Sequence, residues 1–167
     1  MRPLTGTVVL VAGVFAGLAG CANQAAEPPP KPLDTLIAAT DSINPSAAGT
    51  PQRVDLMIFQ LRAATAFTES QLTALYPTVE RARSALGADL LQTRKLQIAP
   101  AVEQQVEIQL DDQARYIGVL AAFEQFGQAR WKDIVEVRDE QLKDKLLLRS
   151  RQLTIALDRL SVELRLD

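Results

Sequence analysis

Two pairs of neighbouring carboxylates, Asp111-Asp112 and Asp139-Glu140, are the residues whose type and spacing could support acid–base chemistry. Both pairs lie in polar stretches that predict turns, and a working acid or base needs burial or a charged partner to move its pKa. We therefore interpret them as solvated turn residues. The chain has no His, which removes the commonest general base and zinc ligand. No catalytic, metal-binding or cofactor-binding residue is predicted, and the chain is not expected to be an enzyme.

The sole cysteine, Cys21, ends the segment Leu18-Ala19-Gly20-Cys21. An early basic residue, Arg2, and an apolar run from Val8 to Leu18 precede it, in the order typical of a secretory signal. The ending resembles the bacterial lipobox, in which the Cys thiol is acylated and the signal is cut just before it. A transmembrane helix with an incidental Cys is the alternative, but about a dozen apolar residues are too few for a span of roughly 20. We predict that residues 1–20 are a signal peptide and that Cys21 carries lipid.

Ala22 follows the predicted lipid anchor, and this position resembles that of lipoproteins sorted to the outer membrane, whereas an Asp there retains a lipoprotein in the inner membrane. Residues 21–32 hold the lipidated Cys and a Pro-rich stretch from Glu27 to Pro32. Such a stretch forms neither helix nor central strand and is expected to act as a semi-rigid tether. The predicted location is the periplasmic face of the outer membrane.

The rest of the chain, residues 33–167, is long enough for one domain with a single core. The net charge of −2 gives no basic surface for nucleic acid, which is therefore not an expected partner. Because no second cysteine is available for an internal disulfide, stability must come from apolar burial.

Alternation of apolar and polar residues predicts a mainly β domain. Residues 53–62 carry apolar side chains on both faces, which indicates a strand buried on both sides, although a short run of this kind is ambiguous with helix. Residues 116–123 form a nearly continuous apolar run in which Gly118 permits a close approach or a bulge. The remaining predicted strands are 33–39, 105–110 and 131–137, and the pattern changes to period two beyond Leu96 and Ile98.

A small helical insert is predicted at about 68–92. Thr68-Glu69-Ser70-Gln71 has the pattern of a capping box before a turn of helix that Pro77 ends. A second helix is expected to begin at Thr78 and to stop near Gly87, and a third short piece to cover 88–92.

The C-terminal residues 141–167 allow two interpretations. Leucines from Leu142 to Leu164 fall at spacings that suit a helix seam. The segments on either side of Asp158-Arg159 also alternate cleanly, which favours a hairpin with these two residues as its loop. We favour the hairpin, because it continues the period-two pattern of the preceding segments.

Residues 40–51 are dense in turn-forming residues and predict a long loop between the first two strands. Such a loop is either a mobile connection or a binding segment. Ile43 is an apolar residue in an otherwise polar run and is expected to be exposed at the loop tip, either by accident or as an anchor for a partner.

Several segments together resemble the TssJ (SciN/VasD-like) family, the outer-membrane lipoproteins of the bacterial type VI secretion system. They occur in the order and spacing of that family: Ile43-Asn44-Pro45, Ile58-Phe59-Gln60-Leu61, Phe67, Leu86-Gly87-Ala88-Asp89-Leu90-Leu91, Gly118-Val119-Leu120-Ala121-Ala122-Phe123 and Ala129-Arg130-Trp131. The sequence departs from the family at Pro100-Ala101, where Pro-Gly is usual, and its tail lacks an obvious Gly-Asn turn.

The resemblance implies a transthyretin-like two-sheet β-sandwich with a small helical insert, facing the periplasm. It also implies a structural role in the type VI secretion membrane complex, by binding the periplasmic C-terminal region of TssM, which assembles with TssL in the inner membrane. The loop between the first two strands would make this contact. The partner-binding residues expected there are Asp41, Ser42, Ile43, Asn44 and Pro45.

A periplasmic lipoprotein that binds a small hydrophobic ligand is the alternative function. The two hypotheses differ in what the interior should contain. A carrier requires a sizeable apolar cavity with a few convergent polar groups, whereas an adaptor requires a filled sandwich and a protein-binding loop or edge.

Overall fold

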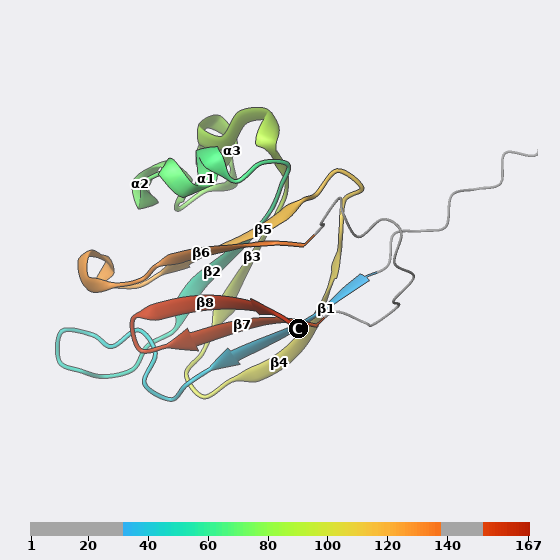
Figure 1. Ribbon diagram of the computed structural model, residues 1–167. Coiled ribbons are helices and arrows are strands. Elements are labelled where there is room, and N and C mark those ends of the chain that lie inside the picture. Colours follow the sequence, from blue (N-terminus) through green and yellow to red (C-terminus); the bar gives the residue numbers. More distant parts are fainter. Residues whose placement is uncertain (1–31, 138–151) are drawn as a thin grey trace, which may run out of the picture.

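A computed structural model describes residues 32–137 and 152–167. Within these residues, two four-stranded sheets pack face to face (Figure 1), with the strand orders β4-β1-β7-β8 and β3-β2-β5-β6. The two-sheet, mainly β sandwich predicted from the sequence is confirmed. The strands are β1 (Pro32–Ala39), β2 (Val54–Leu61), β3 (Leu90–Ile98), β4 (Glu103–Gln109), β5 (Tyr116–Ala122), β6 (Lys132–Glu136), β7 (Gln152–Asp158) and β8 (Ser161–Leu166).

Neighbouring strands are antiparallel except for β1 and β7, which run parallel with Ile37 beside Ile155. From the strand orders, consecutive strands lie in different sheets at the steps from β1 to β2, β3 to β4, β4 to β5 and β6 to β7. Because side chains alternate along each strand, one set from every strand points between the sheets. This set forms the main core, whose most deeply buried members include Ile37, Leu56, Ile117, Leu153 and Ile155.

The strand β2 is buried on both faces, as its sequence predicts. Leu56 and Ile58 point into the main core, whereas Met57, Phe59 and Leu61 point to the outer face of their sheet. A second hydrophobic cluster covers that outer face, where the helical insert packs. The insert consists of α1 (Thr65–Glu69), α2 (Leu72–Leu75), α3 (Val79–Leu86) and the 3₁₀ turn η1 (Gly87–Asp89).

The helix starts that the sequence predicts for the insert are only partly correct. Thr78 caps α3 as predicted, since its Oγ1 accepts a hydrogen bond from the Arg81 N–H at 3.3 Å. The predicted capping box at 68–71 is wrong, because Thr68 lies inside α1 and its hydroxyl donates to the Ala64 carbonyl at 2.9 Å. The predicted third piece is also shorter than 88–92, because β3 begins at Leu90, which pairs with Leu61.

Lys132 fastens the insert to β6. Its Nζ donates to the carbonyl oxygens of Phe67, Thr68 and Ser70 at 3.1, 2.6 and 2.7 Å, where α1 ends. The ammonium also lies over the rings of Phe67 and Trp131. Burial lowers the pKa of Lys132, and the three carbonyl contacts satisfy the hydrogen-bonding capacity of the ammonium in this partly buried place.

A second polar contact joins the insert to β2 and β3. It consists of Asp55 in β2, Lys95 in β3 and Tyr76, the residue that follows α2. The Asp55 Oδ2 accepts from Lys95 Nζ at 2.8 Å and from the Tyr76 hydroxyl at 2.9 Å. Burial by itself would raise the pKa of Asp55, but hydrogen bonds from Lys95 and Tyr76 outweigh it and the pKa lies below its usual value. This carboxylate therefore stabilises the fold above the pH at which an unfolded Asp ionises, and the contribution is lost as the pH falls through its folded pKa.

The hairpin interpretation of the C-terminus is confirmed for the residues that the structure describes, since β7 and β8 pair antiparallel. Its two-residue loop is Arg159-Leu160 rather than Asp158-Arg159, because Asp158 pairs with Ser161. Arg159 takes the positive φ of 37° that the turn requires. Leu142 and Leu146, on which the helical alternative rested, lie outside the described residues.

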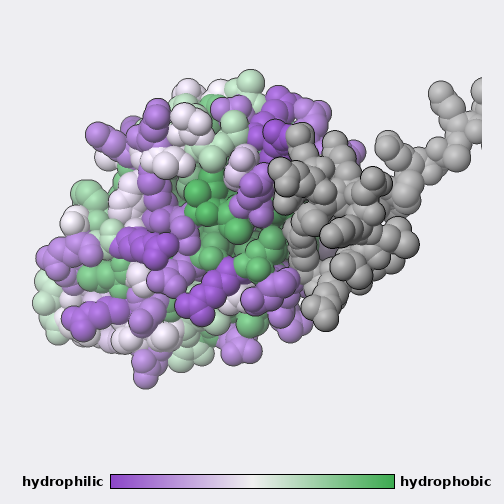
Figure 2. Space-filling model, in the orientation of Figure 1, coloured by the Kyte–Doolittle hydropathy of each residue, from purple (hydrophilic) through white to green (hydrophobic). Residues whose placement is uncertain are grey.

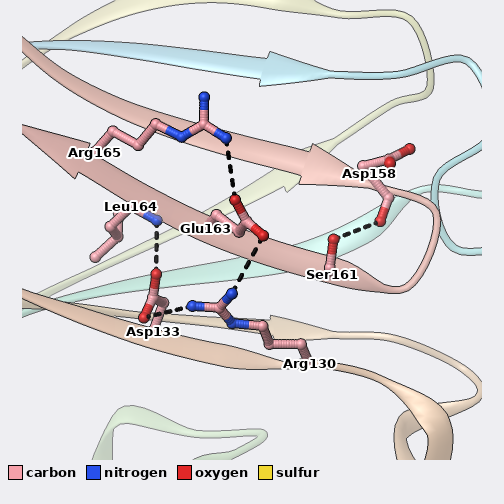
Figure 3. A network of polar contacts seen from close by, with 7 residues as sticks. All are labelled: Arg130, Asp133, Asp158, Ser161, Glu163, Leu164 and Arg165. Carbon is pink, nitrogen blue, oxygen red and sulfur yellow. Dashed lines mark hydrogen bonds and ion pairs between the residues drawn. The ribbon is translucent and has the colours of Figure 1, made fainter.

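The edge strands β6 and β8 bring the two sheets together along one side. The Arg130 N–H donates to the Leu160 carbonyl, and the Val162 N–H donates to the Arg130 carbonyl, both at 2.9 Å. Figure 3 shows the polar contacts beside this junction: Asp133 Oδ2 accepts from the Leu164 N–H at 2.8 Å, and Arg130 pairs with Asp133 and Glu163. The face seen in Figure 2, in the orientation of Figure 1, has hydrophobic residues near its middle and many hydrophilic residues toward its left and upper edges.

Gly118 in β5 allows the insert to pack closely. A Cβ atom built at this position would lie 2.9 Å from two ring atoms of Phe67, whose side chain is almost fully buried. The close approach predicted from the sequence is therefore confirmed.

We predict that Gly118→Ala lowers the free energy of unfolding by about 1–3 kcal/mol, because the buried ring has to move to admit the methyl group. Urea unfolding of the full chain measures this. Gly127→Ala is the matched control, since a Cβ atom there meets no atom within 4 Å. Equal stability of the two variants would contradict the close packing.

Candidate functional site

Four connections meet at one end of the sandwich (Figure 1): residues 40–53, 99–102, 123–131 and 159–160. The strand registers require this arrangement, because Ala39 lies beside Leu157, Ala38 beside Glu103 and Asp55 beside Ala122. Backbone hydrogen bonds join them, for example from Thr40 N–H to the Leu157 carbonyl at 3.0 Å. We call this surface the loop end. Pro32, the first described residue of β1, lies at the opposite end, beside Gln109.

Residues 43–45 of the β1–β2 loop are buried, which corrects the expectation that Ile43 is exposed. Ile43 is 0% exposed and belongs to the main core, while Asn44 and Pro45 are also buried. The loop folds back over the open end of the sandwich, and an apolar side chain there gains more from closing the core than from facing water. Ile43 is therefore a core residue, not an anchor for a partner.

Asn44 joins three of the connections. Its backbone N–H donates to the Arg159 carbonyl at 2.7 Å, its Nδ2 donates to the Arg53 carbonyl at 2.6 Å, and its Oδ1 accepts from the Glu124 N–H at 2.7 Å. The residue has a φ of 47°, in the left-handed region that Asn tolerates better than most residues. The 5% exposed side chain thus has its polar atoms paired and fixes the base of the loop.

The second half of the loop protrudes from this fixed base. Gln125 Nε2 donates to the carbonyls of Pro45 and Ser46 at 2.8 and 3.2 Å. The Ser46 N–H donates to the Thr50 carbonyl at 2.9 Å and closes the loop. Residues 47–53 beyond it are exposed. We call residues 47–52 the apex, and they are the accessible part of the loop.

The structure locates the expected site residues in different environments. Asp41 is exposed and Ser42 is half-buried, so only these two of the five expected loop residues present side chains to a partner. Sequence reasoning missed the apex, because its small uncharged residues carry no motif, and it left the β5–β6 connection unassigned. Cys21 and Ala22 lie outside the described residues.

The described residues support the interpretation of Asp111-Asp112 as part of a turn, since the Asp111 Oδ1 accepts from the Gln113 N–H at 2.9 Å. Asp139-Glu140 lies outside the described residues. Among residues 32–137 and 152–167, no group of three or more Asp, Glu, His or Cys side chains is placed to hold a metal ion. None of the helices in these ranges combines the length and apolar composition needed to cross a membrane.

A small cleft lies at the open edge between β3 and β4. Its volume is about 200 Å³, below the roughly 300–1,000 Å³ of most ligand pockets. Gln60 lines it, but its side chain is already used, donating to the Gln109 carbonyl at 2.9 Å and accepting from the Asp111 N–H at 2.7 Å. These bonds tie the two sheets together, so this glutamine acts in the structure of the sandwich.

Comparison with known proteins assigns the chain to a family. The family described as type VI secretion lipoprotein (VasD, EvfM, TssJ) matches residues 31–160. The chain belongs to this family. It is thus a lipoprotein-family component of the type VI secretion membrane complex. Its location is periplasmic and membrane-associated. The match covers strands β1 to β7 and the helical insert, and it ends just before β8.

Solved structures share the fold. TssJ1, the T6SS lipoprotein from Pseudomonas aeruginosa, is 28% identical with a TM-score of 0.71, over 83% of this chain and 98% of that chain. A chain of a type VI membrane complex is 26% identical with a TM-score of 0.61, over 80% and 98%. A chain in the structure of the T6SS protein TssM C-terminal domain from EAEC is 21% identical with a TM-score of 0.59, over 80% and 97%, and this likeness establishes the fold alone. No curated protein gives a significant match.

We predict that Ile43→Ala lowers the free energy of unfolding of this TssJ-family chain by about 2–5 kcal/mol, because it removes a fully buried side chain and leaves a cavity. Chemical unfolding of the full chain measures the change. Gln52→Ala, at an exposed position of the same loop, is the control and should change stability by less than about 0.5 kcal/mol. An unchanged stability of Ile43→Ala would mean that the loop does not close the core.

Proposed function

We propose that this type VI secretion lipoprotein is an acylated, non-enzymatic adaptor that links the outer membrane to the inner-membrane protein TssM. The observation that carries this proposal is the direction of β1. The chain enters the domain at Pro32, after the predicted lipid anchor and tether, and the β1–β2 loop lies at the other end of the strand. Eight residues of extended strand span about 25 Å. The domain can therefore hold a membrane at one end and a protein at the other.

Anchoring would depend on Cys21, and sorting to the outer membrane on Ala22. Two or more acyl chains give stable attachment to a bilayer without any membrane-spanning segment. The Pro-rich residues 27–32 would separate the domain from the membrane surface as a semi-rigid spacer. This arrangement leaves the loop end free to meet a partner from across the periplasm.

The periplasmic C-terminal region of TssM is the proposed partner, and the apex of the β1–β2 loop is the proposed contact. Hydrogen bonds from Asn44 and Gln125 hold the base of this loop, so little backbone freedom is left to lose on binding. The resemblance of the loop to the TssJ family favours the same partner. TssL would join the assembly through TssM.

The rival function, binding of a small hydrophobic ligand, has less support. The space between the sheets is filled by side chains such as Leu56, Ile117 and Ile155, each 0% exposed. Hollows of about 440–460 Å³ among the described residues lie at the surface, and polar side chains such as Asp34, Gln105 and Glu107 line one of them. A stoichiometric ligand retained by the purified chain in native mass spectrometry would favour the rival.

Replacing Cys21 tests the anchor. We predict that Cys21→Ser leaves an uncut precursor without lipid, because a hydroxyl group cannot replace the thiol as acyl acceptor. Metabolic labelling with palmitate, followed by gel electrophoresis, measures both effects. Ala22→Asp, at the neighbouring position, should keep the label but move the protein to the inner-membrane fraction. Equal labelling of Cys21→Ser would refute the assignment of Cys21 as the lipidated residue.

Charges placed on the apex test the contact with TssM. We predict that Ala47→Asp combined with Ala48→Asp weakens binding of the full acylated chain to the purified TssM periplasmic region by at least tenfold, because the charges lose water on binding. Calorimetric titration in detergent measures the affinity. Gln105→Asp, which places a charge on the exposed side of β4, should leave the affinity unchanged. Full affinity of the apex variant would remove the apex from the interface.

A further inference from the structure

Phe126 is the one large hydrophobic side chain that the described residues expose, at 51% of its surface. It lies in the 3₁₀ turn η2 (Phe126–Gln128) of the β5–β6 connection, at the loop end. The neighbouring aromatic of the same connection, Phe123, is buried in the main core. A hydrophobic residue exposed singly needs no explanation by itself, so the role of this ring is inferred from the loops that surround it.

The backbone that carries this ring is fixed. The Gln128 N–H donates to the Gln125 carbonyl and the Ala129 N–H to the Phe126 carbonyl, both at 3.1 Å. On the N-terminal side of Phe126, the Glu124 N–H donates a hydrogen bond to Asn44 Oδ1 at 2.7 Å. The turn therefore presents the ring from a braced position, so the binding of a partner does not have to order the loop first.

Hydrogen bonds place the β5–β6 turn next to the base of the β1–β2 apex, in the surface of the loop end. Gln125, which precedes the exposed ring, is the residue whose Nε2 bonds the Pro45 and Ser46 carbonyls at the base of the apex. Residues 46–52 and 125–129 contain no charged residue, although charged residues make up 23% of the chain. The centres of protein interfaces are depleted of charge and enriched in aromatic residues, and this surface has both properties.

We propose that Phe126 is the anchor residue of the partner interface, with its ring inserted into an apolar pocket on the partner and the uncharged apex packed around that pocket. The occupant is a folded protein region, and this inference rests on the proposed function, in which that region belongs to TssM. The place of the tether argues against the anchoring membrane as occupant, because Pro32 lies at the end of β1 opposite the loop end. A pocket lined by apolar side chains, without a buried charge, is the chemistry that fits the ring.

Truncating the ring tests the anchor. The full acylated chain, purified in detergent, is titrated with the purified TssM periplasmic region. We expect Phe126→Ala to weaken the affinity by at least tenfold, with most of the change in the dissociation rate. Phe126→Leu should recover part of the loss, since it restores apolar volume. Gln105→Ala, on the exposed side of β4 and outside the proposed interface, is the control and should bind as the wild type does.

The same titrations separate the two proposals. Binding of the wild type with an unchanged affinity of Phe126→Ala overturns the anchor and leaves the adaptor function intact. A wild-type chain that does not bind the TssM region overturns both. The melting temperature of Phe126→Ala should equal that of the wild type, because the side chain is exposed. A fall in melting temperature equal to that of Ile43→Ala would instead make Phe126 a structural residue and overturn the anchor.

Photo-crosslinking identifies the occupant directly. Phe126 is replaced by p-benzoylphenylalanine in the full acylated chain in vesicles, in the presence of the TssM region, and Glu107→p-benzoylphenylalanine, on the exposed side of β4, is the control. An adduct with TssM from position 126, but not from position 107, supports the anchor. An adduct with a second copy of this chain or with lipid overturns it.

Discussion

Burial of β2 on both of its faces is the constraint on which the structure depends. One face closes the sandwich through residues such as Leu56, and the other supports the helical insert through Phe59, both 0% exposed. A strand buried on both faces cannot slip in register, because a shift by one residue would exchange the two sets of side chains. This fixes β3 and β5 on either side of β2 and, with them, the ends of the strands from which the connections start.

Fixed strand ends explain why the loop end can be ordered without regular secondary structure. Ile43 closes the core beneath the loop end. Asn44 forms hydrogen bonds to backbone groups of three connections, and these bonds pair its polar atoms. Gln125 extends the same bonding to the β5–β6 turn. Residues 46–52 and 125–129 of this surface carry no charge, while the groups that hold them are buried or turned inward. Structural and binding roles are thus divided between adjacent residues of the same loops.

Much of the fold could be predicted from the sequence because period-two alternation and apolar runs are local signals. They located β2, β5 and the β7–β8 hairpin. The errors arise where distant residues decide the outcome. Burial of Ile43 depends on the gap between two sheets, which no local pattern reports, and Leu90 joins β3 because Leu61 is there to pair with it. For the proposed site, the sequence indicated the β1–β2 loop but not Phe126, because a single aromatic residue in a polar connection gives no periodic signal.

The position of β1 suits a domain that carries load between two attachments. With a lipid anchor ahead of Pro32 and a partner at the loop end, tension would run along the axis of β1. That strand lies inside its sheet, paired with β4 on one side and β7 on the other over most of its length. Both attachments would pull on the two ends of this one extended strand, so the load would pass along its covalent backbone, which is already near its full length. The two flanking ladders would hold the strand in place while the rest of the domain carries little of the load. A central β1 that connects the tether to the loop would therefore suit the proposed adaptor between two membranes.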